Sequence, residues 1–238
     1  MNIILFEPDE LSHPLALTDP RARHILEVLR RRPGDTFDAG VINGPRGKAT
    51  FVEAREDALV LSFEWADEPR AAVEDIVLIL GMPRPQTARK VLEEATALGV
   101  IAMHFVKTER GEPGYATSKL WTTDEWYRHV IAGAQQAFIT RLPVVTFTHD
   151  LHSLMDVEVK YGTRLALDNY ESPRRLGEVD MATPVLVAVG PERGWSPQER
   201  ELLRASGFQF VHMGERVLRV ETAVVAALSL VRARLGLM

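Results

Sequence analysis

Two arginines three residues apart carry the most distinctive chemistry of this chain. Arg216 and Arg219 lie in the segment 213–223, Met-Gly-Glu-Arg-Val-Leu-Arg-Val-Glu-Thr-Ala, which runs directly into a small-residue, apolar helix. A guanidinium stays protonated in proteins, so it serves as a hydrogen-bond donor and a fixed positive charge rather than as a base. The segment therefore predicts a site for an anionic partner, or for negative charge that develops during a reaction.

A second glycine-bearing turn precedes this segment by about one helix and one strand. Residues 190–194 read Gly-Pro-Glu-Arg-Gly and join a buried strand to a helix whose start is marked by Ser196 and Glu199. Glycine lets the backbone approach a ligand closely, and a helix start offers free N–H donors. We expect the two turns to lie at the ends of neighbouring strands and to form a cofactor site. Taken alone, the turn at 190–194 is better interpreted as a plain connection between strand and helix.

Several familiar catalytic motifs are missing from the sequence. It contains no Gly-x-x-x-x-Gly-Lys-Ser/Thr phosphate loop, no Gly-x-Gly-x-x-Gly after a strand and no Gly-x-Ser-x-Gly elbow. It has no cysteine, which excludes disulfides, thiolate nucleophiles and cysteine-based zinc sites. His149 and His152 are three residues apart without a third ligand nearby, so we expect no metal site.

The expected elements divide the chain into two domains with a linker over residues 66–71. In the first, residues 1–68, we expect strands at 3–6, 36–42, 48–55 and 58–65, and a helix capped by Thr18 or Asp19 with Pro20 in its first turn. Ile25, Leu26, Val28 and Leu29 give that helix an apolar face. In the second, residues 72–238, buried-type strands at 76–80, 101–106, 144–147, 164–167, 185–189 and 208–212 alternate with helices at 85–98, 122–138, 196–206 and 221–235. This alternation predicts a parallel α/β sheet, in which ligands bind off the carboxyl ends of the strands.

Composition and charge set the class of protein. The 238 residues are 46% hydrophobic and 26% charged, as in ordinary globular proteins. We find no run of 18 apolar residues and no signal-peptide pattern, and together with the lack of cysteine this favours a cytoplasmic protein. The net charge of −5 argues against a nucleic-acid partner, yet five cations gather in one short stretch: Arg21, Arg23, Arg30, Arg31 and Arg32. Local potential decides phosphate contact, although a basic stretch by itself is more often a solvated helix face.

Four segments, taken in order, resemble the RsmE family of ribosomal RNA methyltransferases in the SPOUT superfamily. They are His24-Ile25 with Val28-Leu29-Arg30, then Leu98-Gly99-Val100, then Gly190-Pro191-Glu192, and finally residues 216–223. The resemblance covers nearly the whole chain. It implies an N-terminal PUA-like β-barrel over 1–68 and a C-terminal SPOUT domain over 72–238, with a trefoil knot and an S-adenosylmethionine site at about 165–235. It also implies a homodimer.

The resemblance implies roles for individual residues. S-adenosylmethionine would donate a methyl group to N3 of a specific uridine in 16S rRNA of the small ribosomal subunit, leaving S-adenosylhomocysteine, and Arg216 or Arg219 would stabilise negative charge on the uracil. The residues that would line the cofactor are Leu167, Gly190, Glu192, Gly194, Met213, Gly214, Leu218, Arg219, Glu221 and Thr222. Arg219 and Glu221 could pair to fix the loop, or Arg219 could face the RNA. Arg193, with Arg21, Arg23, Arg30, Arg31 and Arg32, would contact RNA.

The chain departs from the family pattern at a few positions. Asn2 stands where an arginine pair is usual, Arg193 replaces a glycine, Glu94 replaces a cation, and Gln135 and Ile139 each lose a charge. These changes keep two alternatives open: a methyltransferase for another rRNA or tRNA site, and an RNA-binding ribosome-assembly factor without turnover. A nucleotide-hydrolysing α/β protein would need a lysine beside residues 190–194, which the sequence lacks.

Overall fold

The computed structural model describes residues 2–66, 75–147, 150–155 and 162–238. Contacts divide the chain into two compact units. Unit 1 comprises Met1–Ala71 together with Ala134–Leu142, and unit 2 comprises Ala72–Gly133 and Pro143–Met238. Apart from Ala66, the expected linker and His149 lie outside the described residues. Within the described part of the chain, no helix is long and apolar enough to cross a membrane.

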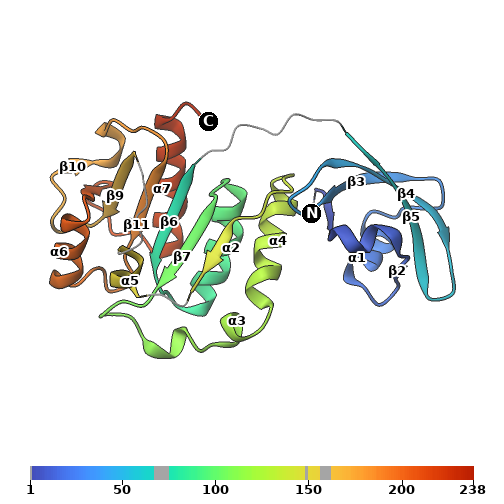
Figure 1. Cartoon of the computed structure of the whole chain (residues 1–238), viewed down its shortest axis with the longest axis horizontal. Helices are drawn as coiled ribbons and strands as arrows, with labels where there is room; N and C mark the ends of the chain where they lie inside the picture. Colours follow the sequence, from blue (N-terminus) through green and yellow to red (C-terminus); the bar gives the residue numbers. More distant parts are fainter. Residues whose placement is uncertain (1, 67–74, 148–149, 156–161) are drawn as a thin grey trace. The chain divides into compact units, whose positions relative to one another are not determined.

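Unit 1 is built on a curled sheet of five strands in the order β1-β3-β4-β5-β2 (Figure 1). β1 and β3 pair in parallel, and the remaining neighbours are antiparallel. The expected barrel is thus an open, curled sheet. Its core is fully apolar and includes Phe6, Phe37, Phe51 and Leu59. The strands are β1 (Ile4–Phe6), β2 (Leu15–Ala16), β3 (Thr36–Val41), β4 (Arg46–Ala54) and β5 (Ala58–Trp65).

The helix of unit 1 begins where the sequence predicts and then changes its winding. Asp19 caps α1 (Pro20–Arg23), because its side chain accepts a hydrogen bond from the backbone N–H of Arg21 at 2.7 Å. The chain continues as a π-helical turn, His24–Val28. Ile25 is fully buried, but Leu26 and Val28 are exposed, so the predicted apolar face is wrong for these two residues. The wider π turn breaks the 3.6-residue spacing on which that prediction was based.

Unit 2 contains a seven-stranded, all-parallel sheet in the order β10-β12-β9-β11-β6-β7-β8. Its central strands β6 and β11 are buried along their whole length, as expected for strands covered on both faces. The two-residue strand β10 was not predicted. The strands are β6 (Ile76–Gly81), β7 (Ala102–Val106), β8 (Val144–Thr146), β9 (Thr163–Leu167), β10 (Arg174–Arg175), β11 (Val185–Val189) and β12 (Gln209–His212).

Helices cover both faces of this sheet (Figure 1). Apolar residues of α5 and α6 pack on one face, and α2 and α7 pack against each other over the other. The predicted glycine stops are confirmed, since Gly99 and Gly207 both have a φ of +79°. The helices are α2 (Pro85–Ala97), α3 (Lys119–Thr122), α4 (Glu125–Gln136), α5 (Leu151–Met155), α6 (Pro197–Ala205) and α7 (Val220–Arg234).

The helix start predicted at residues 122–125 is wrong in detail. Thr122 is the last residue of α3, and α4 begins only at Glu125. The Glu125 carboxylate does not reach back as in a capping box but binds Arg89 Nε at 2.5 Å. The hydroxyl of Thr123 accepts a hydrogen bond from the Glu125 N–H instead. By contrast, the capping box that opens α6 is formed by Ser196 and Glu199 as predicted.

A partly buried ion cluster fixes the first segment of unit 1. The Arg21 guanidinium contacts Glu10 at 2.5 Å and Asp19 at 2.7 Å, donates to the carbonyl of Leu5 at 3.1 Å and lies over the ring of Phe6. The side-chain hydrogen bond from Arg21 lowers the pKa of Glu10. Burial works against the charged form of Asp19, but hydrogen bonds from the side chain and backbone of Arg21 outweigh it and lower that pKa as well.

Replacing Arg21 by methionine should therefore destabilise unit 1 in a pH-dependent way. Both carboxyl groups have a lowered pKa in the folded state, so their contribution is present above the unfolded pKa and is lost as the pH falls through the folded value. At pH 7 we expect Arg21→Met to lower the melting temperature by a few degrees. The difference in melting temperature between Arg21→Met and the parent should become smaller as the pH falls from about 5 to about 3.

The matched control is Arg55→Met, because the Arg55–Glu53 pair is more than half exposed. Exposed pairs of this kind contribute little to stability. The melting temperature of Arg55→Met should therefore equal that of the parent at every pH. A pH-independent difference for Arg21→Met, measured by calorimetry, would contradict the assignment.

Candidate functional site

The carboxyl ends of three strands line up at one edge of the unit 2 sheet. Leu167, the last residue of β9, pairs with Val189 of β11 on one side and with Val211 of β12 on the other. The bend at 190–194 follows β11, and the bend at 213–219 follows β12. The expectation that the two bends end neighbouring strands is thus wrong, because β9 lies between them. Strands about 4.8 Å apart place the two bends roughly 10 Å from each other, with Leu167 in between.

The first bend, residues 190–194, packs closely on the neighbouring strand β6. A Cβ atom at Gly81, the last residue of β6, would lie 2.7 Å from the backbone nitrogen of Pro191. Gly190 is also crowded, since its Cβ would lie 3.2 Å from Gly194 Cα. Gly194 has a φ of +66° and open space where a side chain would be. Packing therefore demands glycine at 81 and leaves little room for a side chain at 190, and the left-handed backbone at 194 favours glycine.

Side chains tie this bend to two other loops. The Glu192 carboxylate accepts a hydrogen bond from the backbone N–H of Arg84 at 2.9 Å, just before α2 begins. Arg110, in the loop after β7, donates to the carbonyl of Arg193 at 3.2 Å. The Glu199 carboxylate accepts from the N–H of Ser196 and from that of Glu109, both at 2.8 Å. Hydrogen bonds between side chains and backbone thus join the bend to the loops before α2 and after β7, and join the start of α6 to the second of these loops.

The bulky residues of this bend do not fill the open space beside it. Trp195 is fully buried, and its indole N–H donates to the carbonyl of Leu167 at 3.1 Å. The indole thus links the first bend to the end of β9 from inside the core. Arg193 is exposed. Neither side chain lies at Gly194, which keeps the space where a ligand would approach.

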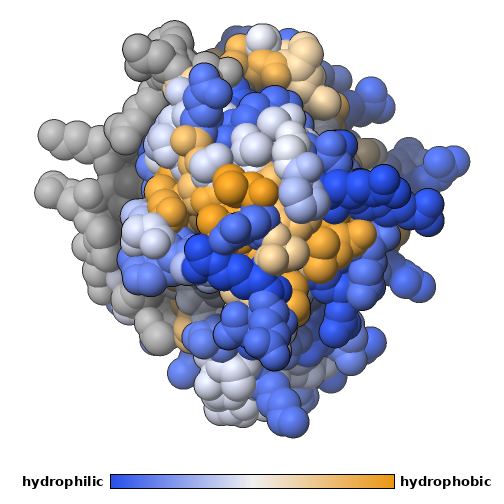
Figure 2. All heavy atoms as spheres, turned by 90° about the vertical axis from the view of Figure 1, so that its right-hand side faces the viewer, coloured by the Kyte–Doolittle hydropathy of each residue, from blue (hydrophilic) through white to orange (hydrophobic). Residues whose placement is uncertain are grey.

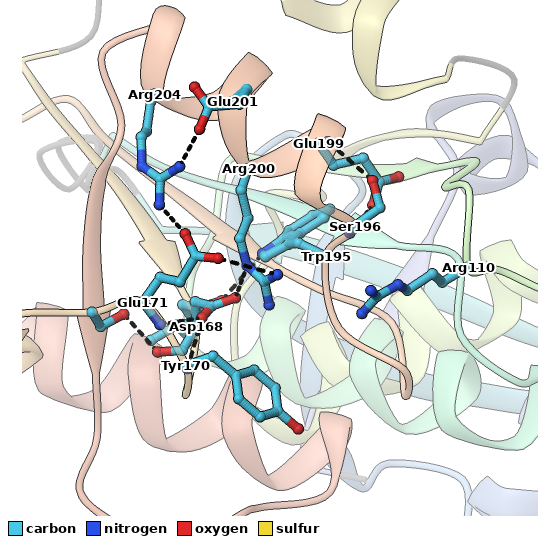
Figure 3. A network of polar contacts seen from close by, with 12 residues as sticks. Arg110, Asp168, Tyr170, Glu171, Trp195, Ser196, Glu199, Arg200, Glu201 and Arg204 are labelled. Atoms are coloured by element: carbon cyan, nitrogen blue, oxygen red, sulfur yellow. Dashed lines mark hydrogen bonds and ion pairs between the residues drawn. The ribbon is translucent and has the colours of Figure 1, made fainter.

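Asp168, immediately after β9, is a buried charged residue at this edge that our sequence analysis missed. It is buried, and its carboxylate binds Arg200 Nε of α6 at 2.8 Å. The other carboxylate oxygen accepts the backbone N–H groups of Tyr170 and Glu171 (Figure 3). An aspartate directly after a buried strand was the available signal. Nothing in the sequence pointed to Arg200 as its partner.

The second bend, residues 213–219, is more open than the first. Gly214 has a φ of +108° with open space around it, and its N–H donates to His212 Nδ1 at 3.0 Å. Val217 and Leu218 are exposed large apolar residues, 79% and 36% exposed. Arg219 precedes the first residue of α7 and has no capping hydrogen bond from its side chain. Glycine and apolar surface here are suited to a flat, partly apolar ligand.

The predicted charged residues of this bend do not pair with each other. Within the described residues, neither Arg216 nor Arg219 forms an ion pair, and both are exposed. Glu221 instead binds Lys90 Nζ of α2 at 3.2 Å. Its own backbone N–H and Lys90 lower the pKa of Glu221. Glu221 therefore anchors the start of α7 to α2, while both guanidinium groups stay at the surface. Thr222 is exposed and Met213 is half-buried.

The predicted RNA-contacting arginines of unit 1 fall into two groups. Arg21 is held in the ion cluster described above, and its charge is neutralised there. Arg23, Arg30, Arg31 and Arg32 are exposed, and Arg30 has a φ of +53°. Figure 2 shows apolar surface among hydrophilic side chains on the face that unit 1 turns to the viewer. The large apolar side chains that the described part of unit 1 exposes are Leu17, Leu26, Val28 and Val52.

Comparison with known proteins decides the family. The model of an RNA methyltransferase domain matches residues 69–232. The ribosomal RNA small subunit methyltransferase E of Treponema pallidum is 37% identical over 98% of this chain and 91% of its own length. The chain belongs to the RsmE family of RNA methyltransferases. The relative named ribosomal RNA small subunit methyltransferase E 1 in Borreliella burgdorferi is 27% identical, with 95% of each chain covered.

Solved structures share the fold along nearly the whole chain. The enzyme of Neisseria gonorrhoeae, crystallised with S-adenosyl methionine, has a TM-score of 0.78 and 27% identity, covering 98% of this chain and 97% of its own. A probable rRNA-methyltransferase of Porphyromonas gingivalis has a TM-score of 0.79 at 24% identity and supports the fold alone. The α/β fold expected from the resemblance is thus confirmed.

Asn2 and Gln135, two positions at which the resemblance led us to expect a charge, meet in unit 1. The backbone N–H of Asn2 donates to the carbonyl of Gln135 at 3.2 Å, and its side-chain amide donates to the carbonyl of Gln136 at 2.7 Å. Neither Asn2 nor Gln135 carries a charge. Glu94 is exposed on α2, and Ile139 is half-buried in unit 1.

The contact between Gly81 and Pro191 makes a prediction about the RsmE fold of unit 2. We expect Gly81→Ala to lower the free energy of unfolding by about 1–3 kcal/mol, because the added methyl group must displace Pro191 backbone. Gly177→Ala is the matched control, since nothing lies within 4 Å of a Cβ at that position. Unfolding in urea is measured by circular dichroism. Equal denaturation midpoints for the two variants would show that the contact between Gly81 and Pro191 does not contribute to stability.

Proposed function

We propose that this chain transfers a methyl group from S-adenosylmethionine to N3 of a specific uridine in 16S rRNA, within the small ribosomal subunit in the cytoplasm. The observation that carries the proposal is the 37% identity, over nearly the full length, to a relative named for methylation of small-subunit rRNA. The S-adenosyl methionine bound to the gonococcal relative supports the choice of cofactor.

The edge residues fit an adenosyl group. The backbone at Gly194 and Gly214 is open where a side chain would be, which lets a ligand approach it closely, and the exposed Leu218 offers an apolar surface for a base. The carboxylates of Glu192 and Glu221 hold the bends through Arg84 and Lys90. The residues that we propose to hold the cofactor are Leu167, Gly190, Glu192, Gly194, Met213, Gly214, Leu218, Arg219, Glu221 and Thr222.

The proposed chemistry requires a fixed positive charge near the uracil. S-adenosylmethionine supplies a methyl group on a positively charged sulfur, which becomes a neutral thioether on transfer. The uridine N3 must lose its proton, which leaves negative charge on the uracil ring. An arginine cannot take this proton, but Arg216 or Arg219 can stabilise the charge from the exposed second bend. The proton then goes to water or to a carboxylate.

The RNA is proposed to contact both units. In unit 1 we assign phosphate contacts to Arg23, Arg30, Arg31 and Arg32 and leave out Arg21, whose charge is already neutralised. In unit 2 the exposed Arg193 has the same role. N3 lies on the pairing edge of the base, so the target uridine must be unpaired or extruded.

We further propose that unit 2 is knotted and that the chain forms a homodimer. In support of the knot, β12 lies between β9 and β10, although it follows both in sequence. In support of the dimer, residues 217–238 include three exposed large apolar side chains, Val217, Leu230 and Met238. Light scattering at micromolar concentration tests the dimer, and a monomer mass would exclude it.

Another RNA target is the alternative, and the joint loss of charge at Asn2 and Gln135 favours it. Its test uses ribosomal subunits from a strain that lacks the gene. Primer extension stops at an N3-methylated uridine, so a stop that appears in 16S rRNA after treatment with the purified protein supports the first proposal. Methylation of tRNA or 23S rRNA alone would replace it.

Arg219→Ala should lower kcat for methyl transfer to 30S subunits by on the order of 100-fold, because a positioned donor to developing charge is lost. Arg234→Ala is the matched control, since Arg234 lies at the far end of the same helix and pairs with Asp180. Transfer of tritiated methyl groups provides the measurement. Turnover by Arg219→Ala that equals that of the control would assign the charge stabilisation to Arg216 or to another group.

Replacing Arg30, Arg31 and Arg32 together by glutamine should raise KM for 30S subunits while the Kd for S-adenosylmethionine stays unchanged. Each lost phosphate contact should also reduce the salt dependence of 30S binding, by about 0.7–0.9 in the slope of log K against log salt. Lys48→Gln with Arg55→Gln is the control, because both cations are paired on the same unit. An unchanged slope in the triple variant would show that this stretch is a solvated surface.

A further inference from the structure

Tyr170 is an exposed aromatic side chain at the edge where the proposed site lies. It is 80% exposed and follows the end of β9 by three residues. β9 lies between the strands that lead into the two bends, so the loop that follows β9 is the third segment at this edge. Figure 3 shows the Tyr170 ring extending away from the ion pairs, which lie above it in this view. The largely exposed ring offers a flat apolar surface that a ligand can cover.

The loop that carries Tyr170 is held rigidly. One oxygen of the buried Asp168 carboxylate accepts the N–H groups of Tyr170 at 2.7 Å and Glu171 at 2.8 Å. The hydroxyl of Ser172 donates to the Asp168 carbonyl at 2.5 Å, and the Asp168 N–H donates to Val211 of β12 at 3.1 Å. The backbone of the loop therefore has one well-defined conformation, and the exposed ring starts from a fixed Cα.

The second partner of Asp168 is a buried charge whose function the fold does not explain. Arg200 is 6% exposed and binds Asp168 at 2.8 Å and Glu171 at 3.5 Å. Burying two charges is costly, and an apolar pair often stabilises a core better. The start of α6 does not need Arg200, since Ser196 and Glu199 cap it. The Arg200 guanidinium also lies 5.6 Å from the centre of the Tyr170 ring, where it favours the electron-rich ring face.

We propose that Tyr170 stacks on a nucleobase, and that Asp168 and Arg200 are positioning residues that hold its ring at the carboxyl edge. The proposal rests on the function proposed above, which brings two nucleobases to this edge: the adenine of S-adenosylmethionine and an unpaired base of the RNA. The flat π-face is common to both. Stacking on an aromatic side chain tolerates any base, and a ring on a rigid loop loses little conformational freedom on binding.

The experiment measures two dissociation constants without turnover. The Kd for S-adenosylmethionine is measured by calorimetry, and the Kd for 30S subunits by filter binding with S-adenosylhomocysteine present. Tyr170→Ala should weaken one of them by about fivefold or more, and Tyr170→Phe should stay within about twofold of the parent. A change in the first constant identifies adenine as the base, and a change in the second identifies RNA.

The control is Val144→Ala, because Val144 is 63% exposed but begins its strand and so lies at the opposite edge of the sheet. It should leave both constants unchanged. If Tyr170→Ala also leaves both within twofold of the parent, the stacking role is overturned. A parent protein that binds both ligands but transfers no methyl group would refute the proposed function and leave this comparison valid. A parent that binds neither refutes both.

The positioning role is tested by a double-mutant cycle. Asp168→Asn keeps the shape of the side chain but removes the charge that binds Arg200, and it should weaken the same constant as Tyr170→Ala. In the Tyr170→Ala background, Asp168→Asn should change the binding free energy by less than half as much as it does in the parent, because the ring that Asp168 positions is absent. Full additivity, or a lower melting temperature with unchanged binding, would overturn the role. Arg200→Lys, which keeps the buried charge, repeats the test if Asp168→Asn does not fold.

Discussion

The register of the parallel strands in unit 2 is the constraint on which the site depends. Val211, Leu167 and Val189 are paired across β12, β9 and β11, so three chain segments turn away from the sheet at the same level. Helices cover both faces of the sheet, and an edge of strand ends is what remains for a ligand. The indole of Trp195 joins two of these segments beneath that edge through the carbonyl of Leu167. A shift of one residue in β9 would separate them.

Three acidic residues at this edge accept hydrogen bonds from backbone N–H groups. Glu192 accepts from Arg84, Glu199 from Ser196 and Glu109, and Asp168 from Tyr170 and Glu171. Asp168 and Glu199 are buried, whereas Glu192 is exposed, and all three link neighbouring segments of backbone. The exposed charges on the bends include the guanidinium groups of Arg193, Arg216 and Arg219. A chain with a net charge of −5 can therefore present positive groups where an RNA would lie.

Much of this arrangement was predictable from the sequence, because its causes are local. The continuous apolar runs at 76–80 and 185–189 predicted buried parallel strands, Ser196 with Glu199 predicted the start of α6, and Gly99 predicted the end of α2. Apart from the π turn after α1, the predictions that failed concern contacts between distant segments. We expected the two bends to follow neighbouring strands, but β9 lies between those strands. The cations that bind Glu221 and Glu125 both lie on α2, far from either residue in sequence. No spacing along the chain encodes these neighbours.

The basic stretch between residues 21 and 32 shows why a charge must be placed before it is assigned a role. In the sequence Arg21 and Arg23 are equivalent. In the structure Arg21 lies against Phe6 between two carboxylates, while Arg23 is exposed. An arginine already held by two carboxylates would have to give up both before it could bind a phosphate, and a surface phosphate contact does not return that free energy. The same reasoning separates Glu221, which is bound to Lys90, from Arg219, which is exposed and for which the described residues show no ion pair.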